Sequence, residues 1–143
     1  MFRTLIVDDE PIARQVLRDE LDLFWDISIV GEAESGAVAL DLIQRLTPDL
    51  VFLDLQMPGL GGIEVIRSMS GRRWPAIIVV SACEGNSRKA LIAGAVDYLL
   101  KPVHPCYLRG VIEQLRQIPS KSDGATRPED GSHDEEFALR TEF

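Results

Sequence analysis

The fold of this chain is decided by residues 50–59, which read LVFLDLQMPG. Four apolar residues in a row are closed by a Pro-Gly pair, a pattern typical of a buried strand that stops abruptly. Asp54 comes directly after the apolar run. The stretch therefore predicts a carboxylate at the carboxyl end of a core strand.

Two other apolar runs also end in charged residues. Residues 5–7 lead into Asp8 and Asp9, and residues 96–100 lead into Lys101. In an open parallel α/β sheet, ligands bind beyond the carboxyl ends of the strands, so we expect these groups to converge there with Asp54. Three carboxylates at close range repel one another unless a cation joins them. Hard oxygen ligands of this kind suit Mg²⁺, which keeps several waters and shares phosphate oxygens.

Strand and helix patterns alternate five times along the chain. This alternation predicts an α/β fold, with one five-stranded parallel sheet and helices on both of its faces. The third and fourth runs are continuously apolar, as strands covered on both faces should be. The expected strands are residues 3–7, 27–31, 50–54, 76–81 and 96–100.

Apolar residues at helical spacing predict a helix after each strand. Pro11 is well placed in the first turn of the first helix, and Ser35 is the expected N-cap of the second. The fourth helix, residues 86–94, has the weakest stripe and is rich in Ala and Gly. The other expected stripes are Ile12, Val16, Leu17 and Leu21; Ala39, Leu42, Ile43 and Leu46; Ile63, Ile66 and Met69; and Leu108, Val111, Ile112 and Leu115.

Length and composition favour one domain with a tail. The chain has 143 residues, 45% of them hydrophobic, and a net charge of −8. We expect a domain over residues 1–119 and an acidic linker or tail over residues 120–143, where Ser, Gly, Asp, Glu and Pro dominate. No basic footprint for nucleic acid, membrane-spanning run or signal peptide is evident, and two cysteines do not make a disulfide framework. A cytoplasmic setting is therefore expected.

The converging residues suit phosphoryl chemistry on Asp54. A carboxylate can act as the nucleophile toward a phosphoryl group, and the barrier is lowered chiefly by positioned cations. Mg²⁺ held by Asp9 and Asp54 would supply one cation, and Lys101 would supply the second. We expect Lys101 to pair with Asp54 before the reaction. The Ser81 hydroxyl, at the end of the fourth strand, could bind a phosphoryl oxygen.

Four short motifs together resemble the receiver domain of two-component response regulators. They are residues 7–11 (VDDEP), 54–59 (DLQMPG), 81–82 (SA) and 100–102 (LKP), and their order and spacing agree over essentially all of residues 1–119. The resemblance implies the flavodoxin-like, doubly wound (βα)5 fold. It implies a phosphoacceptor signalling domain and not a turnover enzyme. The domain's own catalysis would be limited to phosphoryl transfer and slow hydrolysis of the aspartyl phosphate.

The resemblance also assigns roles to the acidic residues. It implies that Asp54 accepts a phosphoryl group from a histidine kinase or phosphotransfer protein. It implies that Asp9 binds Mg²⁺ directly, that Asp8 binds partly through water, and that the backbone carbonyl of Gln56 is a further ligand. Gly61 stands where the family usually has Asp, but that residue is not a ligand in the family.

The remaining site residues follow from the same resemblance. Lys101 and Ser81 would contact the phosphoryl group, with Ser81 in place of the commoner Thr. Tyr98 stands where the family keeps an aromatic residue that swings inward on activation, and the bond between Lys101 and Pro102 is commonly cis. Conformational change should reach residues 84–117, where we expect a surface for a phosphorylation-enhanced homodimer.

Residues 8–14 and 94–102 resemble one subclass more closely, the receivers that carry a LytTR-type DNA-binding domain. That output domain would begin near residue 130 or later. The resemblance therefore implies contact with DNA only through a domain that this chain does not contain, and transcription as the regulated output.

Two other functions stay open on sequence alone. One is a phosphohydrolase of the haloacid dehalogenase type, which also uses an Asp nucleophile and Mg²⁺. That family places a second Asp two residues after the nucleophile, where this chain has Gln56, and adds a cap domain. The other is a stand-alone receiver that acts through protein contacts without phosphorylation.

Plainer interpretations exist for several of these residues. Asp8 and Asp9 are also a typical acidic pair at a helix start, where the helix dipole favours negative charge. Tyr98 is equally compatible with ordinary packing. Cys83 lies two residues beyond Ser81, and we interpret it as a small passive side chain.

Overall fold

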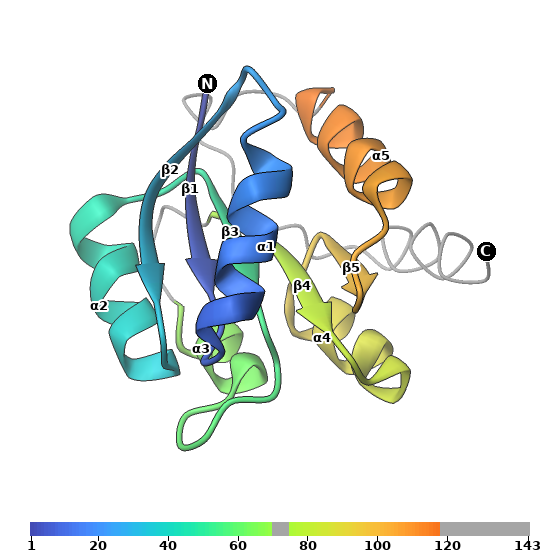
Figure 1. Cartoon of the computed structure of the whole chain (residues 1–143). Coiled ribbons are helices and arrows are strands. Elements are labelled where there is room, and N and C mark those ends of the chain that lie inside the picture. Colours follow the sequence, from blue (N-terminus) through green and yellow to red (C-terminus); the bar gives the residue numbers. More distant parts are fainter. Residues whose placement is uncertain (70–74, 118–143) are drawn as a thin grey trace.

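Strands and helices alternate along the whole of the described chain, as the sequence predicts (Figure 1). The computed structural model describes residues 1–69 and 75–117. The expected tail, residues 120–143, lies outside the described residues. The elements are β1 (Phe2–Val7), α1 (Pro11–Leu21), β2 (Ile27–Ala33), α2 (Gly36–Leu46), β3 (Leu50–Leu53), α3 (Gly62–Ser68), β4 (Ala76–Ser81), the 3-10 turn η1 (Glu84–Asn86), α4 (Ser87–Ala93), β5 (Asp97–Leu100) and α5 (Pro105–Arg116).

The five strands form one parallel sheet in the order β2-β1-β3-β4-β5. This is the flavodoxin-like order, and it confirms the predicted fold class. The strand ends differ slightly from the expectation. β3 ends at Leu53, so Asp54 is the first residue beyond it, and β2 continues to Ala33.

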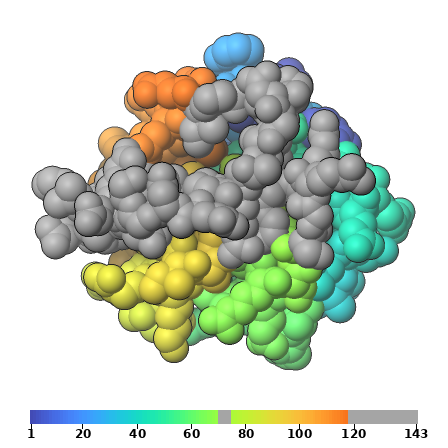
Figure 2. All heavy atoms as spheres, turned by 180° about the vertical axis from the view of Figure 1, so that it is seen from behind, coloured from blue at the N-terminus to red at the C-terminus, as the bar shows by residue number. Residues whose placement is uncertain are grey.

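Each face of the sheet is covered by its own layer of helices. Alternate residues of a strand point to opposite faces. Accordingly Leu5 and Val7 of β1 pack in the layer that contains α2, α3 and α4, whereas Ile6 packs with α1 and α5. Figure 1 shows α1 and α5 on the near face, and Figure 2 shows α2, α3 and α4 from behind. Both faces of the sheet are thus buried, which explains the unbroken apolar runs.

Helix α1 corrects one predicted stripe. Leu17 and Leu21 are buried, but Ile12 is 80% exposed and Val16 is 54% exposed. Ile12 and Val16 lie on one i, i+4 row of the helix, and Leu17 and Leu21 lie on the neighbouring row. The two rows are offset by one residue, which is a rotation of about 100° around the helix. The row of Leu17 and Leu21 faces the sheet, so the row of Ile12 and Val16 faces solvent.

The other helices agree more closely with the sequence. The Ser35 hydroxyl accepts a hydrogen bond of 3.2 Å from the Val38 amide and caps α2, and Pro11 is the first residue of α1. All four residues of the α5 stripe are buried. The predicted fourth helix is a 3-10 turn followed by only seven helical residues, which bury Ala90 and Ala93. Among the described helices, none is long and apolar enough to cross a bilayer.

Gly62 lets the start of α3 pack tightly beneath the end of β3. A Cβ atom at this position would lie 2.6 Å from the Asp54 carbonyl oxygen and 2.8 Å from Leu55 Cα. Real Cβ atoms do not approach backbone so closely. Glycine is therefore required here for close packing, and it fixes the loop that follows Asp54.

Candidate functional site

The carboxyl ends of three strands deliver charged groups to one edge of the sheet. Asp8 follows β1, Asp54 follows β3 and Lys101 follows β5. Backbone pairing continues past the strand ends, because the Asp8 amide donates to the Ala33 carbonyl (3.0 Å) and the Asp54 amide donates to the Val7 carbonyl (2.9 Å). The first two carboxylates are therefore attached to rigid backbone, not to free loops.

Three carboxylates form the acidic cluster of this edge. One oxygen from each of Asp8, Asp9 and Asp54 lies within 4.8 Å of the others. Asp8 and Asp54 are only 5% and 4% exposed, and Asp9 is the most accessible of the three. Several carboxylate oxygens at this spacing, with one open side, fit a hard divalent cation that keeps part of its water shell.

Lys101 is the cation that the described structure provides. Its Nζ atom donates a hydrogen bond of 2.7 Å to Asp8 Oδ2 and lies 3.7 Å from Asp54 Oδ2. The nearest partner is thus Asp8, while the expected partner Asp54 is the more distant one. Burial lowers the pKa of Lys101, but the hydrogen bond that Lys101 donates to Asp8 and the charge of Asp54 outweigh burial and raise the pKa. The bond between Lys101 and Pro102 is cis.

Asp54 has an unusual electrostatic environment. Burial raises its pKa above the ordinary value, and the charges of Asp8 and Asp9 add to the rise. The Gln56 amide, which donates to Asp54 Oδ1 at 3.2 Å, and the charge of Lys101 offset part of this effect. The ionised carboxylate is therefore held in a place that disfavours it until further positive charge arrives.

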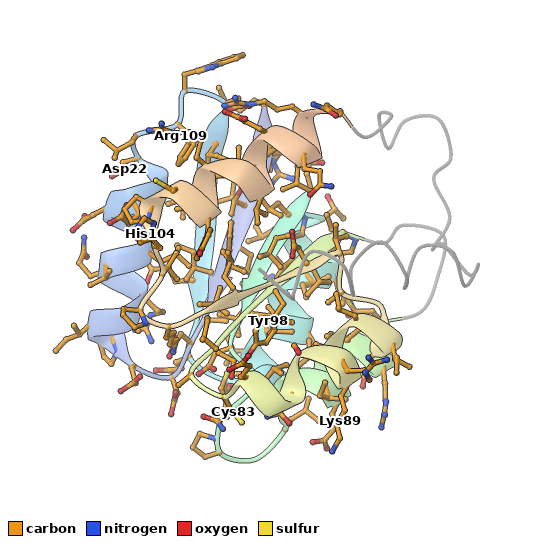
Figure 3. All side chains as sticks on the ribbon, turned by 90° about the vertical axis from the view of Figure 1, so that its right-hand side faces the viewer. Asp22, Cys83, Lys89, Tyr98, His104 and Arg109 are labelled. Carbon is orange, nitrogen blue, oxygen red and sulfur yellow. The ribbon has the colours of Figure 1, made fainter. Side chains whose placement is uncertain are left out.

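Ser81 and Tyr98 are connected through Cys83. The Ser81 hydroxyl is buried and accepts a hydrogen bond of 3.2 Å from the Cys83 amide. The Tyr98 hydroxyl donates to the Cys83 carbonyl, and Figure 3 shows Cys83 below Tyr98 in the lower part of the view. Sequence spacing gave no sign of this link, because Cys83 lies in the loop after β4 whereas Tyr98 lies on β5.

A groove lies beside Tyr98, between β5, η1 and α5. Its volume is about 710 Å³. Leu100 and Tyr107 contribute exposed apolar surface, 43% and 62% exposed respectively. The groove falls inside the expected output range of residues 84–117. The lining residues include Glu84, Ser87, Tyr98, Leu100, Cys106 and Tyr107.

Comparison with known proteins gives the family. The family model described as the response regulator receiver domain matches residues 4–113. The chain belongs to the response regulator receiver family. The solved receiver domain of the putative response regulator NarL from Mycobacterium tuberculosis superposes with a TM-score of 0.73 at 30% identity, covering 82% of this chain and 98% of that one. The response regulator domain of Thermotoga maritima CheB gives 0.71 at 33% identity, with 82% and 95% covered.

Curated relatives of this receiver are longer proteins. The transcriptional regulatory protein BtsR of Escherichia coli K12 is 40% identical over 129 residues, which cover 90% of this chain and 54% of BtsR. An uncharacterized response regulatory protein of Vibrio vulnificus is 41% identical over 122 residues, 85% of this chain and 50% of that protein. The receiver thus spans about half the length of these relatives.

Family membership fixes the general role of the chain. Receivers are typically signalling domains and not turnover enzymes, and they interact with kinases or phosphotransfer proteins. They bind Mg²⁺ at an acidic pocket, which corresponds in kind to the cluster of Asp8, Asp9 and Asp54. The family that the chain matches is therefore the receiver family and not the haloacid dehalogenase family of the hydrolase alternative.

Proposed function

We propose that this receiver accepts a phosphoryl group on Asp54 from the phosphohistidine of a kinase or phosphotransfer protein. The observation that carries this proposal is the placement of Asp54 between Asp8, Asp9 and Lys101 at the carboxyl edge of the sheet. Like charges held together at a buried carboxylate favour the arrival of a cation, and that cation together with Lys101 would offset the negative charge of an incoming phosphoryl group.

The reaction moves one phosphoryl group between two proteins. A bond forms between an Asp54 carboxylate oxygen and phosphorus, the bond from phosphorus to the donor imidazole nitrogen breaks, and that nitrogen takes a proton from water. Only the ionised form of Asp54 is nucleophilic. Mg²⁺ would be held by Asp8, Asp9, Asp54 and the Gln56 carbonyl, and when bound it supplies positive charge that stabilises both the carboxylate and the transferring oxygens.

Lys101 supplies the second positive charge. Its Nζ atom is already 3.7 Å from Asp54 Oδ2, so a short movement away from Asp8 brings it to the new phosphoryl oxygens. Neutralisation of Asp8 by a bound cation would favour this movement, because it would weaken the pair between Lys101 and Asp8. Ser81 would donate its hydroxyl hydrogen to another phosphoryl oxygen. The same hydroxyl oxygen accepts from the Cys83 amide, so a movement of Ser81 toward the phosphoryl group would be passed to Cys83.

The output follows from the links between Ser81, Cys83 and Tyr98. Movement of Ser81 would disturb the loop whose carbonyl holds the Tyr98 hydroxyl, and Tyr98 lines the groove beside α5. The neighbouring helix α4 is short and anchored mainly by Ala90 and Ala93, so a modest free energy of about 1–3 kcal/mol could shift it. We infer a phosphorylation-enhanced homodimer through residues 84–117.

The regulated process is inferred to be transcription in the cytoplasm. The match to about half of BtsR, a transcriptional regulatory protein, supports a further output domain in the whole protein. From the resemblance of residues 8–14 and 94–102 we infer that this domain is of the LytTR DNA-binding type, joined to a receiver of residues 1–119 by a linker from residue 120. In that arrangement DNA contacts only the output domain, and receiver dimerisation would pair two such domains.

Incubation with acetyl phosphate and Mg²⁺ tests the proposed reaction. We expect one acid-labile phosphoryl group per chain, detected by intact-protein mass spectrometry. Steady turnover of a phosphate ester by the purified protein would contradict a phosphoacceptor role and favour the hydrolase.

Amide hydrogen exchange, measured with and without the phosphoryl mimic beryllofluoride, tests the output surface. Changes in protection confined to residues 11–46 would rule out residues 84–117 as that surface.

A further inference from the structure

Arg14 lies behind the acidic cluster and connects it to β2. Its Nη1 atom donates a hydrogen bond of 2.7 Å to the backbone carbonyl of Asp8, and its Nε atom donates one of 3.0 Å to Glu32 Oε1. Glu32 stands on β2, directly opposite Ile6 of β1. A single guanidinium thus joins two strand ends, and it is well shielded, with 17% of its side chain exposed.

The carbonyl that Arg14 holds belongs to the peptide between Asp8 and Asp9. Because a peptide unit is planar, fixing the Asp8 oxygen also fixes the direction in which the Asp9 backbone leaves. The Asp8 carboxylate has its own contacts, from Lys101 and from the Glu10 amide. The Asp9 carboxylate makes no hydrogen bond or ion pair with another described residue, so its position depends on its backbone.

Glu32 offsets the positive charge that the Arg14 guanidinium brings close to the acidic cluster. A lone guanidinium close to the cluster would repel an incoming metal ion. Glu32 accepts hydrogen bonds from both Arg14 and Arg18, and its Oε2 atom lies 2.7 Å from Arg18 Nη2. Burial raises the pKa of Glu32, but the hydrogen bonds from Arg18 and Arg14 outweigh burial and lower it. Glu32 therefore stays ionised and offsets the charge of Arg14.

We propose that Arg14, anchored by Glu32, is a positioning residue for metal binding, which orients the peptide between Asp8 and Asp9 so that both carboxylates face Mg²⁺. This inference rests on the proposed function of the acidic cluster. Arginine suits the task because its planar fork serves two acceptors in different directions at once, whereas the lysine ammonium is a point charge on a flexible stem.

Arg18 provides a matched control. It binds the same Glu32 carboxylate from the next turn of α1, but its hydrogen bond of 2.8 Å goes to Glu32 and not to the Asp8 carbonyl. Arg14→Gln and Arg18→Gln each remove one ion pair between α1 and β2. Only Arg14→Gln also releases the peptide between Asp8 and Asp9.

The test is calorimetric titration of Mg²⁺ into wild type, Arg14→Gln, Arg14→Lys and Arg18→Gln without a phosphodonor. Groups that orient metal ligands typically contribute about 10–100-fold in affinity, so we expect a loss of that size for Arg14→Gln. Arg14→Lys should bind more weakly than wild type, and Arg18→Gln should stay within about twofold of wild type. Equal affinities of Arg14→Gln and Arg18→Gln would overturn the inference.

A second measurement separates positioning from general destabilisation. The rate of phosphorylation by acetyl phosphate should need more Mg²⁺ for half-saturation in Arg14→Gln, yet approach the wild-type rate at saturating Mg²⁺. A lowered maximal phosphorylation rate in Arg14→Gln, with an unchanged Mg²⁺ concentration for half-saturation, would contradict the positioning role of Arg14. If Arg14→Gln does not fold, Arg14→Lys decides, and wild-type Mg²⁺ affinity in that variant overturns the inference. Absence of Mg²⁺ binding by wild type would instead overturn the proposed function, and this inference with it.

Discussion

The Lys101 ammonium is hydrogen-bonded to Asp8 at 2.7 Å, a full ångström closer than its 3.7 Å approach to Asp54. The cation of the site is thus held by one carboxylate of the acidic cluster while the proposed phosphoacceptor lies within easy reach. This arrangement allows Mg²⁺ to replace Lys101 at Asp8, and it explains how metal binding could prepare Lys101 for the phosphoryl group.

Replacing Lys101 with Ala should leave the fold intact and tighten Mg²⁺ binding. The ammonium competes with the metal for Asp8, and a partly exposed ion pair contributes about 0.5–1 kcal/mol, or roughly two- to fivefold in the dissociation constant. Titration calorimetry measures the affinity. The variant should also lose dimerisation in response to phosphodonor, so wild-type dimerisation of Lys101→Ala would contradict its coupling role.

Replacing Asp54 with Asn should stabilise the metal-free protein at neutral pH. The raised pKa of Asp54, caused by burial and then by Asp8 and Asp9, means that the folded state disfavours its ionised form. The contribution of Asp54 to wild-type stability is then fully present below its unfolded pKa and is lost as pH rises through its folded pKa. The advantage of Asp54→Asn should therefore vanish in acid. Urea unfolding across pH measures it, with exposed Asp22→Asn as the control; equal curves for Asp54→Asn and wild type would refute the prediction.

Replacing Gly62 with Ala should destabilise the fold and disturb the loop after Asp54. The added methyl group would meet the Asp54 carbonyl at 2.6 Å, and overpacking of this kind costs about 1–3 kcal/mol. Gly110 in α5 is the matched control, because a Cβ there meets nothing within 4 Å. Gly110→Ala should stabilise by about 0.5–1 kcal/mol, since a helical glycine is replaced. Equal effects of the two variants in urea unfolding would count against the packing role of Gly62.

Replacing Tyr98 with Phe should loosen the output surface before any phosphorylation. The Cys83 carbonyl loses its hydroxyl donor, at a cost of about 0.5–1.5 kcal/mol. We expect faster amide exchange over residues 84–93 and unchanged exchange over α1, measured by hydrogen-exchange mass spectrometry. Tyr107→Phe, on a side chain that is 62% exposed, is the control. Identical exchange in Tyr98→Phe and Tyr107→Phe would show that the hydroxyl does not hold this segment.

The sequence predicted the sheet and the convergence of Asp8, Asp54 and Lys101 because both depend on local patterns. A continuous apolar run followed by a charged residue marks a buried strand end, and parallel strand ends meet at one edge. Which carboxylate Lys101 prefers depends on distances across β1, β3 and β5, and no local pattern carries that information.

Contacts between elements were the part that the sequence could not supply. The exposed row of Ile12 and Val16 looked like core because α1 has two adjacent apolar rows, and only packing on the sheet selects one of them. The bridge from Arg14 to Glu32 and Asp8 joins residues 18 and 6 positions apart, and it forms only once β2 lies beside β1.

Peptide mapping of the phosphorylated protein tests the central claim most directly. Wild type and Asp54→Asn are incubated with acetyl phosphate, with and without Mg²⁺, and digested for mass spectrometry. The account predicts a phosphoryl group only on the wild-type peptide that contains Asp54, and only with Mg²⁺ present. Phosphate on Asp54→Asn, or on another residue of wild type, would contradict Asp54 as the phosphoacceptor.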